Sequence, residues 1–325
     1  MLNFLKKNWF VCLIVLVFTG FSIFYIYDTN KGKLKGKTVN GEDVVYSIND
    51  EDVTISQFYD DLYKKNGTDS LLTLFESAVA NAGVTTTNEI KDNAEEQAST
   101  IIASFQSQYG NAYEEYLNSA LAETGYTNLV DYLIVAEKMN QITADYAKAN
   151  FDDLKIRDIS YILIRFENPG EPTDEPTDDE KARMKAVDDA LASGKEFGVV
   201  ASQFSEDSTT ASNGGKLGVI DKNSSLDTAF LETALSLQDG ETSDWIKSAV
   251  ADFGYFRIVN NASTQATLEN MYLDSDPYLE LVQTNDASLG NAAIWAKAQE
   301  LGVDFKGNED IEKEIKDYFA PEEGE

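Results

Sequence analysis

The sequence predicts an α+β protein in which an apolar N-terminal helix precedes a mainly helical chain, with one mixed segment set into that chain. Three observations support this. A long apolar run without charges opens the sequence. Apolar residues recur every three and four positions before residue 153 and after residue 262, and short runs rich in β-branched residues lie between residues 154 and 262. With 325 residues, the chain has room for two or three domains.

The opening run extends from Trp9 to Tyr27 and contains no charged residue. As a helix it would be roughly 28 Å long, close to the thickness of a membrane's hydrocarbon core. We interpret residues 1–28 as an uncleaved signal anchor, a single transmembrane helix that attaches the protein to the cell membrane. Three alternatives stay open: a cleaved signal peptide, a lipoprotein signal ending at Cys12, and a buried core helix. No A-x-A-like cleavage site follows the run, and bulky residues directly precede the cysteine.

Charge and composition exclude several classes of function. Lys and Arg total 26 against 57 Asp and Glu, which gives a formal net charge of −31. Because nucleic-acid binding depends on cations that contact phosphate, we expect no nucleic-acid partner. Histidine is absent and the single cysteine lies in the apolar run, so Ser-His-Asp catalysis, Cys-His catalysis and the usual zinc sites are excluded. We therefore expect no metal and no cofactor.

The first part of the soluble chain is predicted to be a linker followed by helices. Residues 29–43 are rich in lysine and glycine, which is typical of a linker. Residues 44–153 begin with a short strand at Val44–Ile48 and a turn, and then show a helical pattern from Thr54 without any proline. Asn66–Gly67 is expected to interrupt the first of these helices.

Residues 154–262 carry the mixed pattern. A β-branched run predicts a first strand at Ile156–Ile164, and Thr177 with Glu180 three residues later predicts a capping box that starts a helix. Two more helices and two closing strands are expected at residues 197–204, 230–237, 245–246 and 255–259. This order indicates an α+β domain, after which residues 263–325 return to helical patterns.

Six short motifs follow one another along the mixed segment. They are Ser160–Ile164, Gly194–Phe197, Ser205–Ser208, Gly214–Gly218, Leu237–Ser243 and Gly254–Ile258. In this order and at this spacing they resemble the motifs of parvulin-type peptidyl-prolyl isomerases, the PpiC or rotamase type. Each motif alone is weak, and the resemblance rests on their succession across residues 156–260.

The flanking segments extend the resemblance to nearly the whole chain. An anchor, a helical segment, a parvulin-like domain and C-terminal helices together resemble the PrsA-like extracytoplasmic foldases, whose helical segments are SurA-like. The resemblance implies that residues 44–153 and 263–325 join into one chaperone lobe into which the parvulin-like domain is inserted. It also implies a soluble part on the extracytoplasmic face, with unfolded or partly folded exported proteins and prolyl peptides as partners. A homodimer through the lobe is compatible with this, but no residue argues for it.

The resemblance further implies a proline pocket and a central polar residue. Leu217, Leu226 and Phe230 stand where the family's proline pocket lies, although ordinary core residues would look the same. Asp207 stands at the family's central Asp or Cys position, although an aspartate in a Ser-Glu-Asp-Ser turn is common for reasons of turn chemistry alone.

Two positions that hold histidine in active members of the family hold other residues here. They are Tyr161 and Phe256. Tyr161 can replace one hydrogen bond through its hydroxyl, whereas Phe256 can replace none, and an incomplete polar network is worse than a complete one. We therefore expect Asp207 and Tyr161 to carry any catalysis, with Phe256 as a fourth substrate-binding residue.

These observations leave the question of enzyme activity open. The main hypothesis is a membrane-anchored foldase of the parvulin family whose isomerase activity is weakened or lost. The alternatives are a non-catalytic holdase and a structural surface protein, each using a degenerate parvulin scaffold. Residues 171–180 contain six acidic residues, so this loop would repel phosphorylated substrates, unless it is simply a solvated surface loop.

Overall fold

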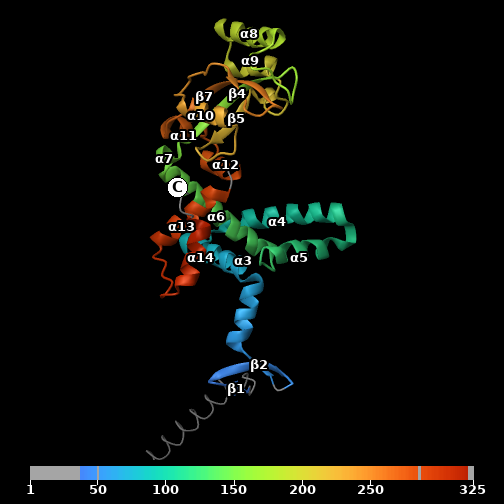
Figure 1. The fold of residues 1–325 in the computed structure, drawn as a ribbon, viewed down its shortest axis with the longest axis vertical. Coiled ribbons are helices and arrows are strands. Elements are labelled where there is room, and N and C mark those ends of the chain that lie inside the picture. Colours follow the sequence, from blue (N-terminus) through green and yellow to red (C-terminus); the bar gives the residue numbers. More distant parts are fainter. Residues whose placement is uncertain (1–36, 50, 285–286, 321–325) are drawn as a thin grey trace, which may run out of the picture. The chain divides into compact units, whose positions relative to one another are not determined.

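The structure is a computed structural model that describes residues 37–49, 51–284 and 287–320 (Figure 1). The predicted signal anchor at residues 1–28 and most of the predicted linker lie outside these residues. None of the helices in the described ranges has both the length and the apolar character needed to cross a membrane. The sequence divides between Ser70 and Leu71 into two compact units, which are described separately.

The first unit contains a small antiparallel sheet and the beginning of a long helix. The strands β1 (Thr38–Val39), β2 (Glu42–Ile48) and β3 (Glu51–Thr54) are arranged in the order β1-β2-β3. Residues 51–54, which the sequence suggested as a turn and a helix start, thus form a third strand. Helix α3 (Ile55–Gly83) continues through Asn66–Gly67, so the expected interruption is wrong. A single glycine destabilises a helix by only about 1 kcal/mol relative to alanine, and the helical turns on both sides of it can offset this loss.

The second unit contains a mainly helical lobe. Its helices are the C-terminal part of α3, α4 (Asn88–Tyr109), α5 (Tyr113–Glu123), α6 (Leu129–Ala149), α7 (Phe151–Leu154), α13 (Ala287–Glu300) and α14 (Glu309–Phe319), with one 3-10 turn, η1, at Gly110–Ala112. Two of these helices, α4 and α6, begin at N-cap side chains. The Thr87 side chain accepts a hydrogen bond from the Ile90 backbone N–H, and the Asn128 side chain accepts from backbone N–H groups in the first turn of α6. In Figure 1, α4 and α5 form an antiparallel pair.

Segments far apart in the sequence share the core of this lobe. Val79 of α3 and Ile142 of α6 pack in one buried cluster with Ile294 of α13 and with Ile315 and Phe319 of α14. Burying these apolar side chains together stabilises the lobe by about 25 cal/mol per Å² removed from water. The two ends of the second unit are therefore held together by a common core.

A four-stranded antiparallel sheet forms the mixed domain. Its order is β5-β4-β7-β6, with β4 at Arg157–Arg165, β5 at Lys216–Ile220, β6 at Ile246–Lys247 and β7 at Gly254–Ala262. The helices of the domain are α8 (Asp178–Ala192), α9 (Phe197–Phe204) and α10 (Thr228–Ser236), and η2 (Ala211–Asn213) is a 3-10 turn. The predicted capping box is confirmed, because Thr177 and Glu180 bond reciprocally at the start of α8.

The two faces of β4 serve different cores, because successive side chains of a strand point to opposite sides. Ile162 and Ile164 pack against α8 and α9. Ile159, Tyr161 and Leu163 face the other way, toward α10 and β7. The expected α+β architecture, with a mostly helical lobe and a mixed domain, is confirmed.

Two short helices, α11 (Gln265–Met271) and α12 (Pro277–Thr284), lie between the mixed domain and the lobe in sequence. Leu268 and Leu281 from these helices share a buried cluster with Ala147 of α6 and with Ile156 and Val219 of the domain. A buried carboxylate, Asp158, accepts a hydrogen bond from the Tyr272 hydroxyl within the same region. The domain and the lobe therefore contact each other through a packed core.

Candidate functional site

An apolar cavity of about 130 Å³ opens on the mixed domain between β4, β5, α10 and β7. Its lining consists of Tyr161, Leu163, Arg165, Asp207, Leu217, Leu226, Asp227, Phe230, Phe253 and Phe256. All six site residues expected from the sequence are in this set. Larger cavities exist in the helical lobe, but none of those contains a residue of this group.

Three aromatic rings contact one another in the cavity. The rings of Tyr161, Phe230 and Phe256 lie edge to face, with centroids 5.0 to 5.8 Å apart and interplanar angles of 75° to 88°. Phe230 and Phe256 are buried. Edge-to-face pairs are favourable for aromatic quadrupoles, so the three rings hold one another in place. Leu217 and Leu226 are half-buried beside them and complete an apolar surface.

A carboxylate and a tyrosine hydroxyl form the polar side of the cavity. The Tyr161 hydroxyl donates a hydrogen bond of 2.7 Å to Asp207 Oδ2. The Thr210 hydroxyl donates to the same oxygen over 2.5 Å, and the Thr210 backbone N–H donates over 3.0 Å. The structure therefore brings together the two predicted polar residues and adds Thr210. The sequence analysis did not find Thr210, although its position three residues after an aspartate is a common turn spacing.

The protonation states follow from these contacts. Burial pushes the pKa of Asp207 upward, but the hydrogen bonds from Thr210, from Tyr161 and from backbone N–H groups outweigh it, and the pKa lies below its usual value. Burial, together with the hydrogen bond to Asp207, raises the pKa of Tyr161 to about 12. At neutral pH the pair is therefore a carboxylate that accepts from a protonated hydroxyl.

Phe256 is the other residue at which the resemblance in the sequence leads us to expect a histidine. Its ring is buried against Phe230 and Tyr161 and has no polar atom that could take part in the network. Its backbone lies opposite Leu163 in the β4–β7 pairing. The floor of the cavity is thus aromatic where a second hydrogen-bonding group would complete the polar network.

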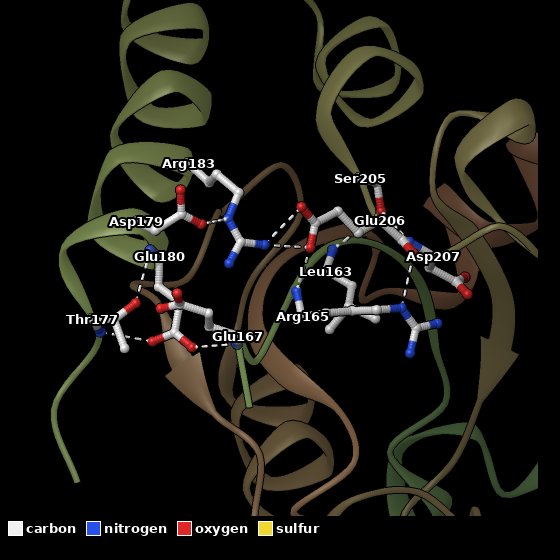
Figure 2. A network of polar contacts seen from close by, with 10 residues as sticks. All are labelled: Leu163, Arg165, Glu167, Thr177, Asp179, Glu180, Arg183, Ser205, Glu206 and Asp207. Carbon is white, nitrogen blue, oxygen red and sulfur yellow. Dashed lines mark hydrogen bonds and ion pairs between the residues drawn. The ribbon is translucent and has the colours of Figure 1, made fainter. Parts of the chain in front are cut away.

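A network of polar contacts fixes the turn that carries Asp207 (Figure 2). The Ser205 hydroxyl accepts from the Leu163 backbone, and the Glu206 backbone N–H donates to the Leu163 carbonyl. The Glu206 carboxylate accepts from the Arg165 backbone over 2.7 Å and from the Arg183 guanidinium over 2.7 Å. Residues 205–207 are therefore attached to β4, which places the Asp207 carboxylate beside Tyr161.

The opposite wall is fixed by Asp227, which the sequence analysis did not single out. One carboxylate oxygen accepts from the Phe230 backbone at the start of α10, and the other accepts from the Ser248 hydroxyl and the Ala249 backbone, each over 2.8 Å. Asp227 thus connects the helix that carries Phe230 with the turn that leads to Phe253. Both phenylalanines line the cavity.

The Gly-Gly motif has a steric reason. Gly215 has a φ of +76°, and a Cβ at this position would lie 2.2 Å from the carbonyl oxygen of Tyr161. The Gly215 carbonyl also accepts a hydrogen bond from the Tyr161 backbone N–H. Only glycine allows the two chain segments to approach this closely. The motif therefore positions Leu217 on β5 next to Tyr161 on β4.

The arrangement can hold a small apolar ring beside a fixed negative charge. Within the described ranges, no group of three or more His, Cys, Asp or Glu residues could hold a metal ion. The chain offers here an apolar surface, the hydroxyl of Tyr161, the guanidinium of Arg165 and two carboxylates. Of these carboxylates, Asp207 is held beside Tyr161, whereas both oxygens of Asp227 already accept hydrogen bonds from the opposite wall. These groups can bind and orient a substrate, and they contain no nucleophile activated by a base.

Comparison with known proteins assigns the domain. Residues 161–255 match the sequence model of the Rotamase family, described as the PPIC-type PPIase domain. The mixed domain with its apolar cavity is therefore a parvulin-type rotamase domain, as the motifs predicted.

Beyond this domain, the chain is similar to PrsA foldases. It is 27% identical to the foldase protein PrsA of Geobacillus kaustophilus over 66% of this chain and 69% of that protein. It is 24% identical to PrsA of Bacillus subtilis over 86% of both. The match to PrsA of Clostridium kluyveri is 29% identical and spans only about half, 48%, of that relative. Among solved structures, PrsA of Bacillus cereus aligns with 86% of this chain and 97% of its own length, at 18% identity and a TM-score of 0.37.

Proposed function

We propose that this protein is a membrane-anchored extracytoplasmic foldase whose helical lobe holds unfolded exported proteins while the parvulin-type domain binds their prolyl segments. The observation that carries the proposal is the apolar cavity in which Asp207 and Tyr161 stand beside Leu217, Leu226 and Phe230. The similarity to PrsA foldases along much of the chain supports the same role. The apolar run at Trp9–Tyr27 supports the membrane attachment.

The chemistry of prolyl isomerisation matches these groups. Rotation about a peptide bond has a barrier of about 18–20 kcal/mol, and no covalent bond needs to be made to lower it. A catalyst must bind the twisted amide better than either planar form. An apolar cavity removes water that stabilises the planar, charge-separated amide. A carboxylate next to the amide oxygen disfavours the same charge separation. In this proposal the proline ring occupies the apolar wall and Asp207 provides the fixed charge.

The same geometry argues for weak catalysis. Asp207 is ionised and directs one oxygen at two hydroxyl donors, so the polar half of the site is ordered. Phe256 contributes no hydrogen bond where active members have histidine. Orientation of the substrate's prolyl carbonyl then depends on the Asp207–Tyr161 hydrogen bonds alone, without a second hydrogen-bonding group at position 256. We propose that isomerase activity is weakened and that binding of unfolded segments is the larger part of the function.

A coupled prolyl-peptide assay tests the catalytic part. The full chain is compared with an Asp207→Ala variant and with a Tyr161→His/Phe256→His double variant. Acceleration by the unchanged chain that is lost with Asp207→Ala supports a working isomerase. Activity in the double variant alone shows a sound domain whose catalysis has been lost.

A second assay tests the holding of clients. The full chain is added to a chemically unfolded protein, and aggregation is followed by light scattering. Suppression of aggregation by the unchanged chain and by Asp207→Ala alike supports client binding that does not need the prolyl site. If the chain suppresses no aggregation and accelerates no isomerisation, the foldase proposal fails and a structural surface protein is the better interpretation.

A further inference from the structure

A second cavity, of about 280 Å³, lies in the helical lobe and shares no residue with the proline pocket. It is formed by the C-terminal part of α3, the connection between α5 and α6, and the first half of α6. Its lining consists of Thr73, Glu76, Thr124, Tyr126, Tyr132, Val135, Ala136, Met139 and Asn140. The lining mixes apolar side chains with one carboxylate and two tyrosine rings.

The carboxylate of this cavity lacks a compensating partner. Glu76 is half-buried, and within the described ranges its carboxylate makes no hydrogen bond and no ion pair. Burial raises its pKa above the usual value. The buried ammonium of Lys138, on α6, donates instead to Asn81 over 2.7 Å. A half-buried carboxylate loses part of its hydration, and a ligand that brings a cation would compensate for that loss.

The walls of the cavity suit the same kind of ligand. The rings of Tyr126 and Tyr132 lie edge to face, with centroids 5.5 Å apart and an interplanar angle of 67°. Tyrosine rings attract ammonium and guanidinium groups through their quadrupole. Val135 and Met139 add apolar surface, along which the methylene stem of a long cationic side chain can lie.

Charge distinguishes between the side chains that this cavity could take. An acidic side chain would be repelled by Glu76, and an apolar one would cover the carboxylate without supplying a partner. A lysine or arginine side chain provides both an apolar stem and a charge of the right sign. The net charge of −31 adds a long-range attraction for cations, although that attraction does not select this site.

We propose that this cavity binds a lysine or arginine side chain of an unfolded client segment, with Glu76 as its charge partner and Tyr126 and Tyr132 as its walls. The inference rests on the proposed foldase function, because it assumes that clients are unfolded polypeptides. It adds a specificity for cationic residues that the proline pocket does not provide.

Two fluorescein-labelled peptides test the proposal. Both are short, unstructured and free of proline, and they differ only in that one carries arginine where the other carries citrulline, its uncharged isostere. Binding to the full chain is measured by fluorescence anisotropy at pH 7.5 and moderate salt. We expect the arginine peptide to bind about fivefold tighter than the citrulline peptide, as one partly desolvated charge pair with aromatic neighbours would give.

Two variants separate this site from the overall negative charge. Glu76→Gln keeps the shape of the side chain and removes its charge. With this variant, the arginine and citrulline peptides should bind with nearly equal affinity. Glu95→Gln, an exposed position on α4, changes the net charge equally and should keep the full preference. Equal losses in both variants, or no loss with Glu76→Gln, would overturn the proposal, as would a chain that binds neither peptide.

The outcome is independent of the prolyl site. Because the peptides contain no proline, an inactive or absent isomerase leaves the expected result unchanged. Conversely, a chain that suppresses aggregation but shows no arginine preference keeps the proposed foldase function and loses only the cation site.

Discussion

Replacing Tyr161 by phenylalanine removes a single hydroxyl and tests the polar half of the proline pocket. This hydroxyl donates to Asp207 over 2.7 Å, and Asp207 is only 8% exposed. A hydrogen bond to a charged group contributes about 1.5–3 kcal/mol to stability. Since Thr210 still donates to the same oxygen through its hydroxyl and its backbone, we expect a loss near the lower limit, about 1.5 kcal/mol.

The loss should depend on pH in a definite direction. Burial raises the pKa of Asp207, but the hydrogen bonds from Thr210 and Tyr161 outweigh burial and bring it below the usual value. A carboxyl whose pKa is lowered by folding contributes stability above its unfolded-state pKa of about 3.9, and this contribution disappears as the pH falls through the folded-state pKa. The difference between the unchanged chain and Tyr161→Phe should therefore be full at pH 7 and shrink below about pH 4.

Hydrogen exchange of the β4 and β7 amides measures this loss within the domain itself, and a neighbouring tyrosine provides the control. The hydroxyl of Tyr255, on β7, is buried and has no hydrogen-bond partner among the described residues. Removing it with Tyr255→Phe should be neutral or slightly stabilising. If Tyr161→Phe costs no more than Tyr255→Phe at pH 7, the Tyr161–Asp207 hydrogen bond does not stabilise the site and the reasoning is refuted.

Three other changes have clear expected outcomes. Gly215→Ala should lower the thermal midpoint far more than Gly240→Ala. Both glycines have a positive φ, at which an alanine is strained by about 1–3 kcal/mol. Only at Gly215 would the added Cβ also clash with a backbone carbonyl of β4. Asp227→Ala should cost about 1–2 kcal/mol in urea unfolding through the lost helix cap, and it should weaken prolyl-peptide binding because the turn before Phe253 is released. Glu76→Gln should raise the thermal midpoint at pH 7. Because folding raises the pKa of this carboxyl, its ionised form opposes folding, and the advantage of glutamine should vanish as the pH falls toward about 4.3.

The candidate site was predictable because the motifs that carry its residues follow one another in the order of the family that they resemble. Four of the six residues sit on strands or helices, whereas Asp207 and Leu226 lie in loops. Tyr161 and Leu163 share a face of β4, since the side chains of a strand alternate. In the structure, Phe230 lies on the helix that Asp227 caps, and Phe256 lies opposite Leu163 on the neighbouring strand. Once the motifs are aligned with the family, these positions fall on one cavity. Whether they catalyse isomerisation stays a prediction.

Apart from Thr210, which contacts Asp207 three positions away, the residues that the sequence analysis missed act through contacts between segments far apart in the chain. Glu206 meets Arg183 across 23 positions and Arg165 across 41, and Asp227 meets Ser248 across 21. Nothing in the local pattern marks these residues, because each looks like an ordinary charged surface side chain. Only the fold shows that they fix the two walls of the pocket.

Sequence alone determined the elements whose causes are local. The capping box of Thr177 and Glu180, the apolar periodicity of α6 and the alternation along β4 depend on neighbours within a few positions. The tertiary structure decided the rest. It showed that the last helices share the core of α3 and α6, and that Glu76 has no charge partner among the residues that the structure describes. Those outcomes depend on packing and on charges brought together by folding, which no short stretch of sequence specifies.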